Sequence, residues 1–268
     1  MLAALSRKHI ACGPAWERPG ASPHFNSRGR RAVPWKTDML LHGFLPSLFE
    51  GAAVTLGLAL SSLAVAATLG LAGALAKLSR SRVARAIAGT YTTLIRGVPD
   101  LVLMLLVFYG GQVAVNTVAP MLGHDEYIDL DPFFAGVLTI GFIFGAYLTE
   151  AFRGAFLAVA SGQREAGLAF GMSPRQVLWR ITLPQMLRHA LPGLSNNWLV
   201  LIKATAIVSV IGLSDLMTRG QQAAGNTREP FSFYLAVALI YLIFTSLSEL
   251  AFAWAQKHLA IGVKEGRL

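Results

Sequence analysis

The chain has 268 residues, of which 54% are hydrophobic and only 14% are charged, whereas soluble domains carry roughly 25% charged residues. This composition indicates a protein whose solvent is largely lipid. The formal net charge is +9, but the basic residues lie between apolar runs and form no stripe interleaved with aromatics, which argues against a nucleic-acid-binding protein. The single cysteine, Cys12, excludes an internal disulfide and a multi-cysteine zinc cluster.

Residues 1–38 differ in composition from the rest of the chain. They contain four prolines and seven basic residues against two acidic ones, and no apolar run is long enough for the core of a signal peptide. We expect this segment to be disordered. Met39 follows it directly, so residues 1–38 are interpreted either as an upstream mis-start or as a genuine extension.

Residues 39–268 form the expected transmembrane domain. Five segments in it are apolar and reach the length of about 20 residues that a bilayer-spanning helix needs. They lie at about residues 45–75, 100–121, 132–158, 191–213 and 231–256. The short alternating runs of barrel strands are missing from the sequence, which therefore predicts an all-α membrane protein with five core transmembrane helices.

Loop charges predict the orientation of these segments. Residues 76–99 carry five basic residues and no acidic one, whereas residues 122–131 carry four acidic residues and no Lys or Arg. The loop 159–190 and the C-terminal tail are also net basic. The positive-inside rule then places 76–99, 159–190 and the C-terminus in the cytoplasm. The start of the first span lies outside, which conflicts with the basic residues of 1–38 unless the chain starts at Met39.

A polar, arginine-bearing stretch separates the third and fourth apolar segments. It reads Glu165-Ala166-Gly167, three residues, Gly171, nine residues, then Ile181-Thr182-Leu183-Pro184. We expect a short helix over 163–170 with Ser161 near its start as a cap, followed by a tight turn at Gly171. A second short helix is expected to start at Ser173-Pro174, and Pro184 is expected to end or kink it.

This spacing resembles the EAA motif of permease subunits of ATP-binding cassette (ABC) importers. Every spacing matches, and the one departure is Gly167 in place of the second alanine, a loss of helix propensity of about 1 kcal/mol without a change of chemistry. The resemblance implies the type I ABC importer permease fold, in which this cytoplasmic loop carries coupling helices that sit in a cleft of the ATPase subunit. The alternative is an ordinary amphipathic loop. The implied coupling residues are Arg164, Glu165, Ala166, Gly167, Gly171, Ile181, Leu183 and Pro184.

Further segments, at residues 92–100, 145–155 and 201–206, look like those of polar amino-acid importers. The Val98-Pro99-Asp100 variant, the run 196–198 and the tail 261–264 most resemble the HisQ-type subunits of histidine/lysine/arginine/ornithine importers. The resemblance therefore implies a permease for polar, basic amino acids in the bacterial inner membrane, with glutamine or glutamate as the alternative substrates. It implies three partners, which are a cytosolic ATPase dimer, a second and related permease chain, and a periplasmic amino-acid-binding protein. ATP would be bound by the ATPase, since the chain has no phosphate-binding Gly-x-x-x-x-Gly-Lys-Ser/Thr run, and no cofactor, metal or catalytic residue is expected.

Polar residues inside the apolar segments are candidates for the translocation pathway, because charges at membrane depth are costly and usually functional. The candidates are Asp100, Glu150, Asn196, Asn197 and Lys203. Lys203 could face a carboxylate of a partner subunit or of Glu150, or snorkel to the surface. The alternatives are a local ion pair with Arg153 for Glu150, a favourable helix-dipole position for Asp100 and interhelical hydrogen bonds for the two asparagines.

Two other classes of membrane protein fit less well. An intramembrane enzyme needs paired catalytic groups at depth, yet none of the six histidines lies centrally in a span. An ion-driven secondary transporter would normally have more helices or inverted repeats, and the sequence has no internal repeat. We therefore expect a transport subunit that is not itself an enzyme.

Overall fold

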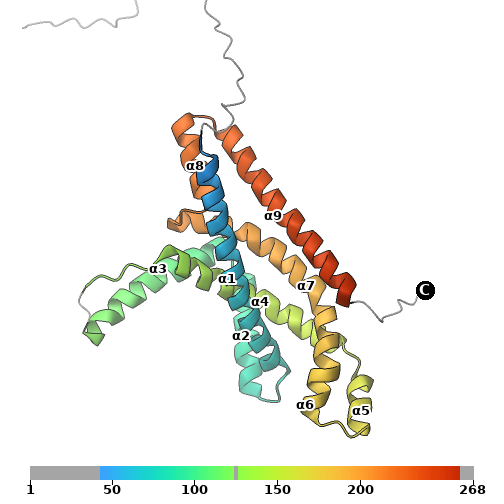
Figure 1. Ribbon diagram of the computed structural model, residues 1–268. Coiled ribbons are helices and arrows are strands. Elements are labelled where there is room, and N and C mark those ends of the chain that lie inside the picture. Colours follow the sequence, from blue (N-terminus) through green and yellow to red (C-terminus); the bar gives the residue numbers. More distant parts are fainter. Residues whose placement is uncertain (1–42, 124–125, 260–268) are drawn as a thin grey trace, which may run out of the picture. The chain divides into compact units, whose positions relative to one another are not determined.

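The computed structural model describes residues 43–123 and 126–259, and these residues form helices joined by short connections (Figure 1). The elements in chain order are α1 (Leu45–Leu78), α2 (Arg82–Gly97), α3 (Asp100–Val118), η2 (Ala119–Leu122), α4 (Pro132–Ala158), α5 (Ser161–Ala169), α6 (Pro174–Val177), η3 (Leu178–Thr182), α7 (Leu183–Ala204), η4 (Thr205–Ile211), α8 (Leu216–Thr227) and α9 (Pro230–Leu259). No strand occurs within these two ranges, and the predicted all-α class is confirmed. The expectations for residues 1–38 and for the tail 261–264 lie outside the described residues.

In the described part of the chain, five helical stretches are long and apolar enough to cross a membrane. They are Leu45–Leu78, Asp100–Leu122, Pro132–Ala158, Pro174–Ile211 and Pro230–Leu259. Four of them start at or within one residue of the expected starts. The fourth differs, because it begins at Pro174 and not near residue 191, so the second half of the expected coupling loop is already part of a long helix.

Helices α1 and α4 pack closely along their length and run in the same direction, as Val65 and then Gly70 of α1 meet Gly141 and then Leu148 of α4. A Cβ atom added at Gly70 would lie 2.6 Å from Leu148, and one added at Gly141 would lie 2.6 Å from Val65. Small residues at these positions let the two backbones approach, which is how helices gain packing contacts in lipid. These contacts fix the position of α4, which carries Glu150.

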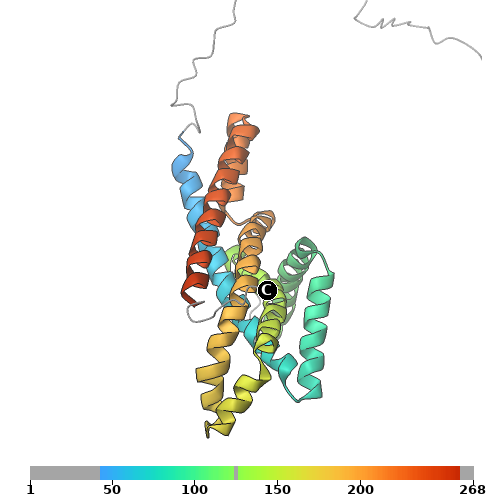
Figure 2. The same cartoon turned by 90° about the vertical axis from the view of Figure 1, so that its right-hand side faces the viewer.

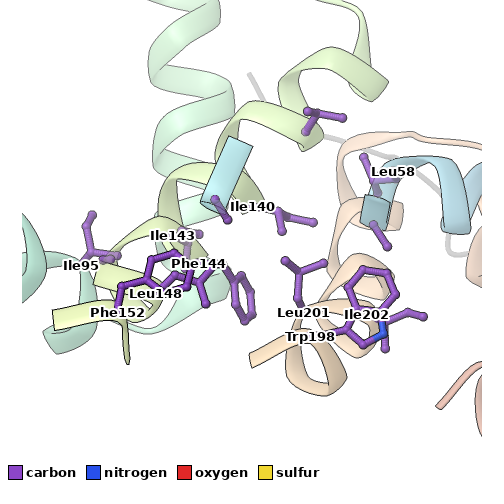
Figure 3. Close-up of a cluster of buried hydrophobic side chains, with 14 of the residues drawn as sticks. Leu58, Ile95, Ile140, Ile143, Phe144, Leu148, Phe152, Trp198, Leu201 and Ile202 are labelled. Atoms are coloured by element: carbon purple, nitrogen blue, oxygen red, sulfur yellow. The ribbon is translucent and has the colours of Figure 1, made fainter. Parts of the chain in front are cut away.

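The main core lies between α4 and its neighbours α1, α2 and α7. Figure 3 shows Ile140, Ile143, Phe144 and Leu148 of α4 on one side of this core, with Trp198, Leu201 and Ile202 of α7 opposite. Leu148, Leu201 and Ile202 are fully buried. Side chains therefore hold α4 against the C-terminal half of α7. The end of α4 and the start of α7 flank the stretch that contains the EAA-like motif.

Helix α2 corrects the interpretation of residues 76–99 as a cytoplasmic loop. Residues 82–97 form a helix whose start is capped by Ser81, with the Ala84 N–H donating to Ser81 Oγ at 3.3 Å. The hydroxyl of Tyr91 donates to the carbonyl of Phe142, 2.5 Å away and near the middle of α4. The loop prediction failed because the basic residues were counted as loop charges, whereas the buried residues of α2 recur on one face and pack inward.

A second, smaller core joins the N-terminal part of α1 to α8 and α9 around Asp215. Asp215 is fully buried and caps α8, since its Oδ1 accepts a hydrogen bond from the Thr218 N–H at 2.9 Å. The N–H of Leu216 donates to Thr55 Oγ1 of α1 at 3.1 Å. Burial raises the pKa of Asp215, and the hydrogen bonds from Thr218 oppose that rise. Asp215 itself lies in the connection between the fourth and fifth apolar stretches.

Candidate coupling element and polar network

The helix α5 ends in a compact turn at Gly171. The Met172 N–H donates to the Gly167 carbonyl at 3.1 Å, and the Gly171 N–H donates to the Leu168 carbonyl at 3.0 Å. These two bonds define a Schellman motif, which satisfies the last carbonyls of a helix. Gly171 has a φ of 80°, a left-handed conformation that glycine adopts without a steric penalty. The predicted tight turn at Gly171 is confirmed.

The starts of α5 and α6 differ in their capping. Ser173 Oγ accepts from the Gln176 N–H at 3.4 Å, and Gln176 Oε1 accepts from the Ser173 N–H at 2.8 Å, which together form a capping box. Pro174 is the first residue of α6, so the predicted start at Ser173-Pro174 is confirmed. The predicted cap at Ser161 is wrong, because Ser161 is already the first helical residue and Ala160 before it has no side-chain acceptor.

Pro184 does not end the second helix of the motif. The helix continues from α6 through η3, a π-helical turn in which the Leu183 N–H donates to the Leu178 carbonyl five residues earlier. A proline inside a regular helix crowds the carbonyl four residues back and cannot donate to it, and the wider π turn relieves that conflict. Leu183 packs against the main core and Pro184 is exposed. The last residues of the motif therefore open a membrane helix.

Gly167, the one departure from the EAA pattern, lies at the closest approach between the two halves of the motif. It is buried, and a Cβ atom there would lie 2.7 Å from Ile181 Cδ1 and 3.1 Å from Val177 Cγ2. The expectation that Gly167 changes only helix propensity is therefore wrong. Glycine here lets α5 fold down onto α6 and η3, so the predicted residues Gly167 and Ile181 are in direct contact across the turn.

The outer surface of this element, which we call the coupling surface, combines charges with exposed aromatic rings. Arg164, Glu165 and Ala166 are all exposed. The side chains of Phe170 and Trp179 are 89% and 68% exposed, and such large apolar groups in a polar segment are typical of protein contact sites. Arg164 also borders a groove of about 420 Å³, lined by Leu75, Phe156, Leu168, Pro174, Val177, Leu178 and Thr182. The coupling surface can therefore place an aromatic side chain in a pocket of a partner protein and present a carboxylate to the same partner.

A polar network surrounds Glu150 on the face of α4 that meets α1 and α2. Glu150 Oε1 forms an ion pair with Lys77 of α1, and Lys77 Nζ also donates to Thr92 Oγ1 of α2 at 2.6 Å. Arg153 Nη1 lies 3.7 Å from Glu150 Oε2, so the predicted local pair is present. The hypothesis that Glu150 pairs with Lys203 is wrong, because its ion pairs within the described residues are with Lys77 and Arg153.

Asp100 approaches the same polar region from the first turn of α3. Its carboxylate interacts with the hydroxyl of Tyr147, and the Arg96 guanidinium lies 5.6 Å from the centre of the Tyr147 ring, a cation–π geometry. A cavity of about 430 Å³ opens here, lined by Lys77, Thr92, Thr93, Arg96, Gly97, Tyr147 and Glu150. The structure therefore brings together two of the predicted pathway residues, Asp100 and Glu150, although they are far apart in the sequence.

Known proteins resemble this chain in both sequence and fold. Residues 68–261 match the family described as binding-protein-dependent transport system inner membrane component. The histidine/lysine/arginine/ornithine transport system permease protein HisQ of Salmonella typhimurium is 52% identical over 229 residues, which are 85% of this chain and 100% of HisQ. This chain belongs to the family of binding-protein-dependent transport system inner membrane components.

Other members of this permease family extend the comparison. The octopine transport system permease protein OccQ of Rhizobium meliloti is 39% identical over 232 residues, covering 87% of this chain and 94% of OccQ. A crystal structure of an amino acid ABC transporter with histidines superposes with a TM-score of 0.69 and 29% identity, covering 80% of this chain and 95% of the other. The predicted type I ABC importer permease fold and the predicted family are confirmed, and the chain is a multi-pass membrane protein.

The remaining pathway candidates of this permease lie on α7, away from the Glu150 network. Asn197 Nδ2 donates to the Gly193 carbonyl of its own helix at 2.8 Å, and this is the one side-chain hydrogen bond that Asn197 makes within the described residues. Asn196 is exposed, and Lys203 is exposed beside a cavity of about 320 Å³ that Tyr234 and Tyr241 of α9 also line. The five candidates thus fall into two groups, with Asp100 and Glu150 in one and the α7 residues in the other.

Several residues of these sites were missed from the sequence. Lys77 and Thr92 were assigned to a loop, and their contact with Glu150 depends on how three helices cross. Phe170 carried a usable signal, since it is a large aromatic residue inside a polar stretch and directly precedes the turn glycine. Trp179 carried the same signal on the other side of the turn.

Proposed function

We propose that this chain is a permease subunit of an ATP-driven importer for basic amino acids, working as one of two permease chains in the bacterial inner membrane. An extracytoplasmic binding protein would deliver the amino acid, and a pair of cytosolic ATPase subunits would bind ATP and drive the change in access. The chain itself would bind no nucleotide, cofactor or metal.

The observation that carries this proposal is the coupling surface on a fold of five apolar helices. Two hydrogen-bonded caps, at Gly171 and at Ser173, hold α5 and α6 as a rigid projection. The projection is continuous with α7 through η3, and its Gly167 side is packed against Ile181. A push on Phe170 or Glu165 would therefore reach a membrane helix without passing through a flexible loop. That is the arrangement required to transmit motion from an ATPase to the pathway.

The same surface supports an orientation. If α5 and α6 dock onto the ATPase, the C-terminal end of α9 lies in the cytoplasm and the acidic connection 126–131 faces the binding protein. The loop charges agree with this orientation, because the connections next to the coupling surface are basic. The basic connections would then face anionic lipid headgroups on the cytoplasmic side. The acidic connection would face basic groups of the binding protein on the other side.

The assignment of basic amino acids is supported by the relatives. HisQ is named for histidine, lysine, arginine and ornithine transport, and OccQ for transport of octopine. The cavity at Tyr147 does not decide between substrates, because Glu150 is already paired with Lys77 and Arg153, so the relatives carry the substrate assignment.

Uptake by the complete complex tests this proposal. Vesicles would hold the permease chains and the ATPase, with binding protein and labelled amino acid on the extracytoplasmic side and ATP on the other. We expect arginine, lysine or histidine to be accumulated, and glutamine and glutamate to enter much more slowly. Preferred uptake of glutamine or glutamate would overturn the substrate assignment, and absence of ATP-dependent uptake of any amino acid would overturn the importer itself.

A further inference from the structure

Glu249 is an acidic residue within the last membrane helix. It lies ten residues from the end of α9, and at about 1.5 Å per residue this places it about 15 Å inside the helix terminus. Glu249 is exposed, and within residues 43–123 and 126–259 it forms no hydrogen bond or ion pair. A carboxylate that faces hydrocarbon without a partner is costly, so an ionisable residue at this depth indicates a contact that another molecule completes.

Two different faces of α9 are exposed on this chain. The first, which we call the Glu249 face, recurs at helical spacing: Ala238, Leu242, Glu249 and Ala253 are exposed, and Thr245 and Gln256 between them are half-buried. The second, which we call the apolar face, comprises Leu239, Ile243, Leu247, Leu250 and Trp254, each at least half exposed. The apolar face is suited to lipid chains. The Glu249 face mixes small and polar residues, which is the composition of helix–helix interfaces in membranes.

Helix α7 lies beside α9 and carries polar residues next to the Glu249 face. Figures 1 and 2 show the two helices side by side, and the cavity of about 320 Å³ between them is lined by Lys203 of α7 and by Tyr234, Ala238 and Tyr241 of α9. Lys203 therefore lies on the side of α9 that carries the Glu249 face. Asn196 precedes Lys203 by two helical turns and is exposed on the same side of α7. Lys203, like Glu249, has no ion pair within the described ranges.

We propose that the Glu249 face, with Lys203 and Asn196 beside it, is the surface that packs against the second permease chain. Glu249 would meet a basic or hydrogen-bond-donating side chain of that partner, and Lys203 an acceptor. This inference rests on the proposed function, because it requires that the importer contain two permease chains. It adds the location of their contact and the chemistry expected on the partner's side.

A protein partner fits this surface better than lipid or substrate. Lipid chains cannot satisfy Glu249 or Lys203, whereas a helix can approach closely at Ala238 and Ala253. Lys203 lies beside Tyr241, and Glu249 is eight residues further along α9, about 12 Å away along the helix axis. A membrane helix that runs alongside α9 passes both positions and can contact both charges.

Photo-crosslinking in the complete complex tests this interface. A photo-reactive phenylalanine analogue would replace Leu242 in one variant and Ile243 in another. These residues are adjacent and almost equally exposed, at 59% and 55%, but they lie on the Glu249 face and on the apolar face respectively. We expect the Leu242 variant to give an adduct with the mass of two permease chains, at a yield several-fold above that of the Ile243 variant. We also expect Glu249→Leu to reduce that yield, and Glu249→Gln to reduce it less.

Equal yields at both positions, or adducts of the Leu242 variant with lipid alone, would overturn the inference. An unchanged crosslink in Glu249→Leu, together with a raised KM for uptake, would also overturn it, since Glu249 would then serve the substrate. ATP-dependent uptake by the unsubstituted complex is measured in the same membranes. If that uptake is present, a negative crosslink contradicts only the interface; if uptake is absent, the proposed function itself fails.

Discussion

The coupling surface and the Glu150 network are both polar, but they are built in opposite ways. The coupling surface is made by contacts within about twenty residues of chain, whose caps at Gly171 and Ser173 are local hydrogen bonds. The Glu150 network joins three helices, and its central ion pair connects residues that are 73 positions apart. The first is exposed and offers its groups to a partner, whereas the second is partly buried and its charges are already paired. We therefore expect damage to the first to uncouple transport, and damage to the second to destabilise the protein.

The largest effects are expected at the coupling surface. Glu165→Lys reverses an exposed charge, and Gly171→Asp adds a negative charge to the exposed left-handed turn between α5 and α6. Both variants should lose ATP-dependent uptake while still inserting in the membrane, as measured by uptake and by the amount of membrane protein.

Gly162→Ala serves as a matched control, because it introduces a Cβ into open space in α5 at an ordinary φ. It should retain uptake. Normal uptake in Glu165→Lys and Gly171→Asp together would contradict the docking role.

Phe170 should be a binding hot spot for the ATPase. Removing an aromatic anchor from the centre of an interface typically costs at least about 2 kcal/mol, so Phe170→Ala should weaken ATPase binding roughly 30-fold without loss of stability. Titration of the ATPase onto purified permease complex measures this affinity. Phe231→Ala is the control, since Phe231 is 79% exposed at the other end of the domain, and an equal loss in both variants would show that Phe170 has no special role.

Substitutions in the Glu150 network should lower the stability of the protein. Lys77→Met leaves Glu150 with Arg153 as its remaining ion-pair partner, so we expect a loss of about 1–3 kcal/mol, between the values for exposed and buried pairs. Thermal unfolding in detergent measures it. Adding Glu150→Gln to Lys77→Met should restore part of the loss, because the unpaired charge is removed. Strictly additive losses in the double variant would contradict the pairing.

The smallest effect concerns Asp215, which belongs to neither region. Burial raises its pKa, so the folded protein holds the proton more tightly than the unfolded chain does. This contribution to stability is complete below the unfolded pKa and is lost as the pH rises through the folded pKa. Asp215→Asn keeps the cap and should flatten the pH dependence of thermal unfolding, whereas Asp215→Ala should flatten it and also lose the cap, at a further cost of about 1 kcal/mol. An unchanged pH dependence in Asp215→Asn would contradict the assignment.

The sequence predicted the features that depend on local chemistry. The five apolar stretches follow from hydropathy and length, and the starts of α3, α4 and α6 follow from proline positions. The turn at Gly171 and the cap at Ser173 were read correctly because each depends on residues within one turn of helix. The cap at Ser161 was read one position too late, which is the usual error at a helix boundary.

What the sequence did not reveal depends on packing between distant segments. The glycine at position 167 was expected to affect only helix propensity, because its contact with Ile181 forms only when α5 folds onto η3. Helix α2 looked like a basic loop although its inward residues recur at helical spacing, because the basic residues were counted as loop charges; only its contact with α4 depends on the fold. Pro184 looked like a helix end, and the π turn that accommodates it has no clear sequence signal. Lys77 could not be assigned to Glu150 for the same reason.

The most direct test of the account is the energy source of uptake in sealed vesicles that hold the complete complex, with the membrane potential and ion gradients collapsed. The account predicts that labelled arginine still accumulates when ATP is present on the side of the coupling surface, and that vanadate or removal of ATP stops it. Accumulation driven by an imposed ion gradient in the absence of ATP would contradict the account and would identify the chain as an ion-driven transporter.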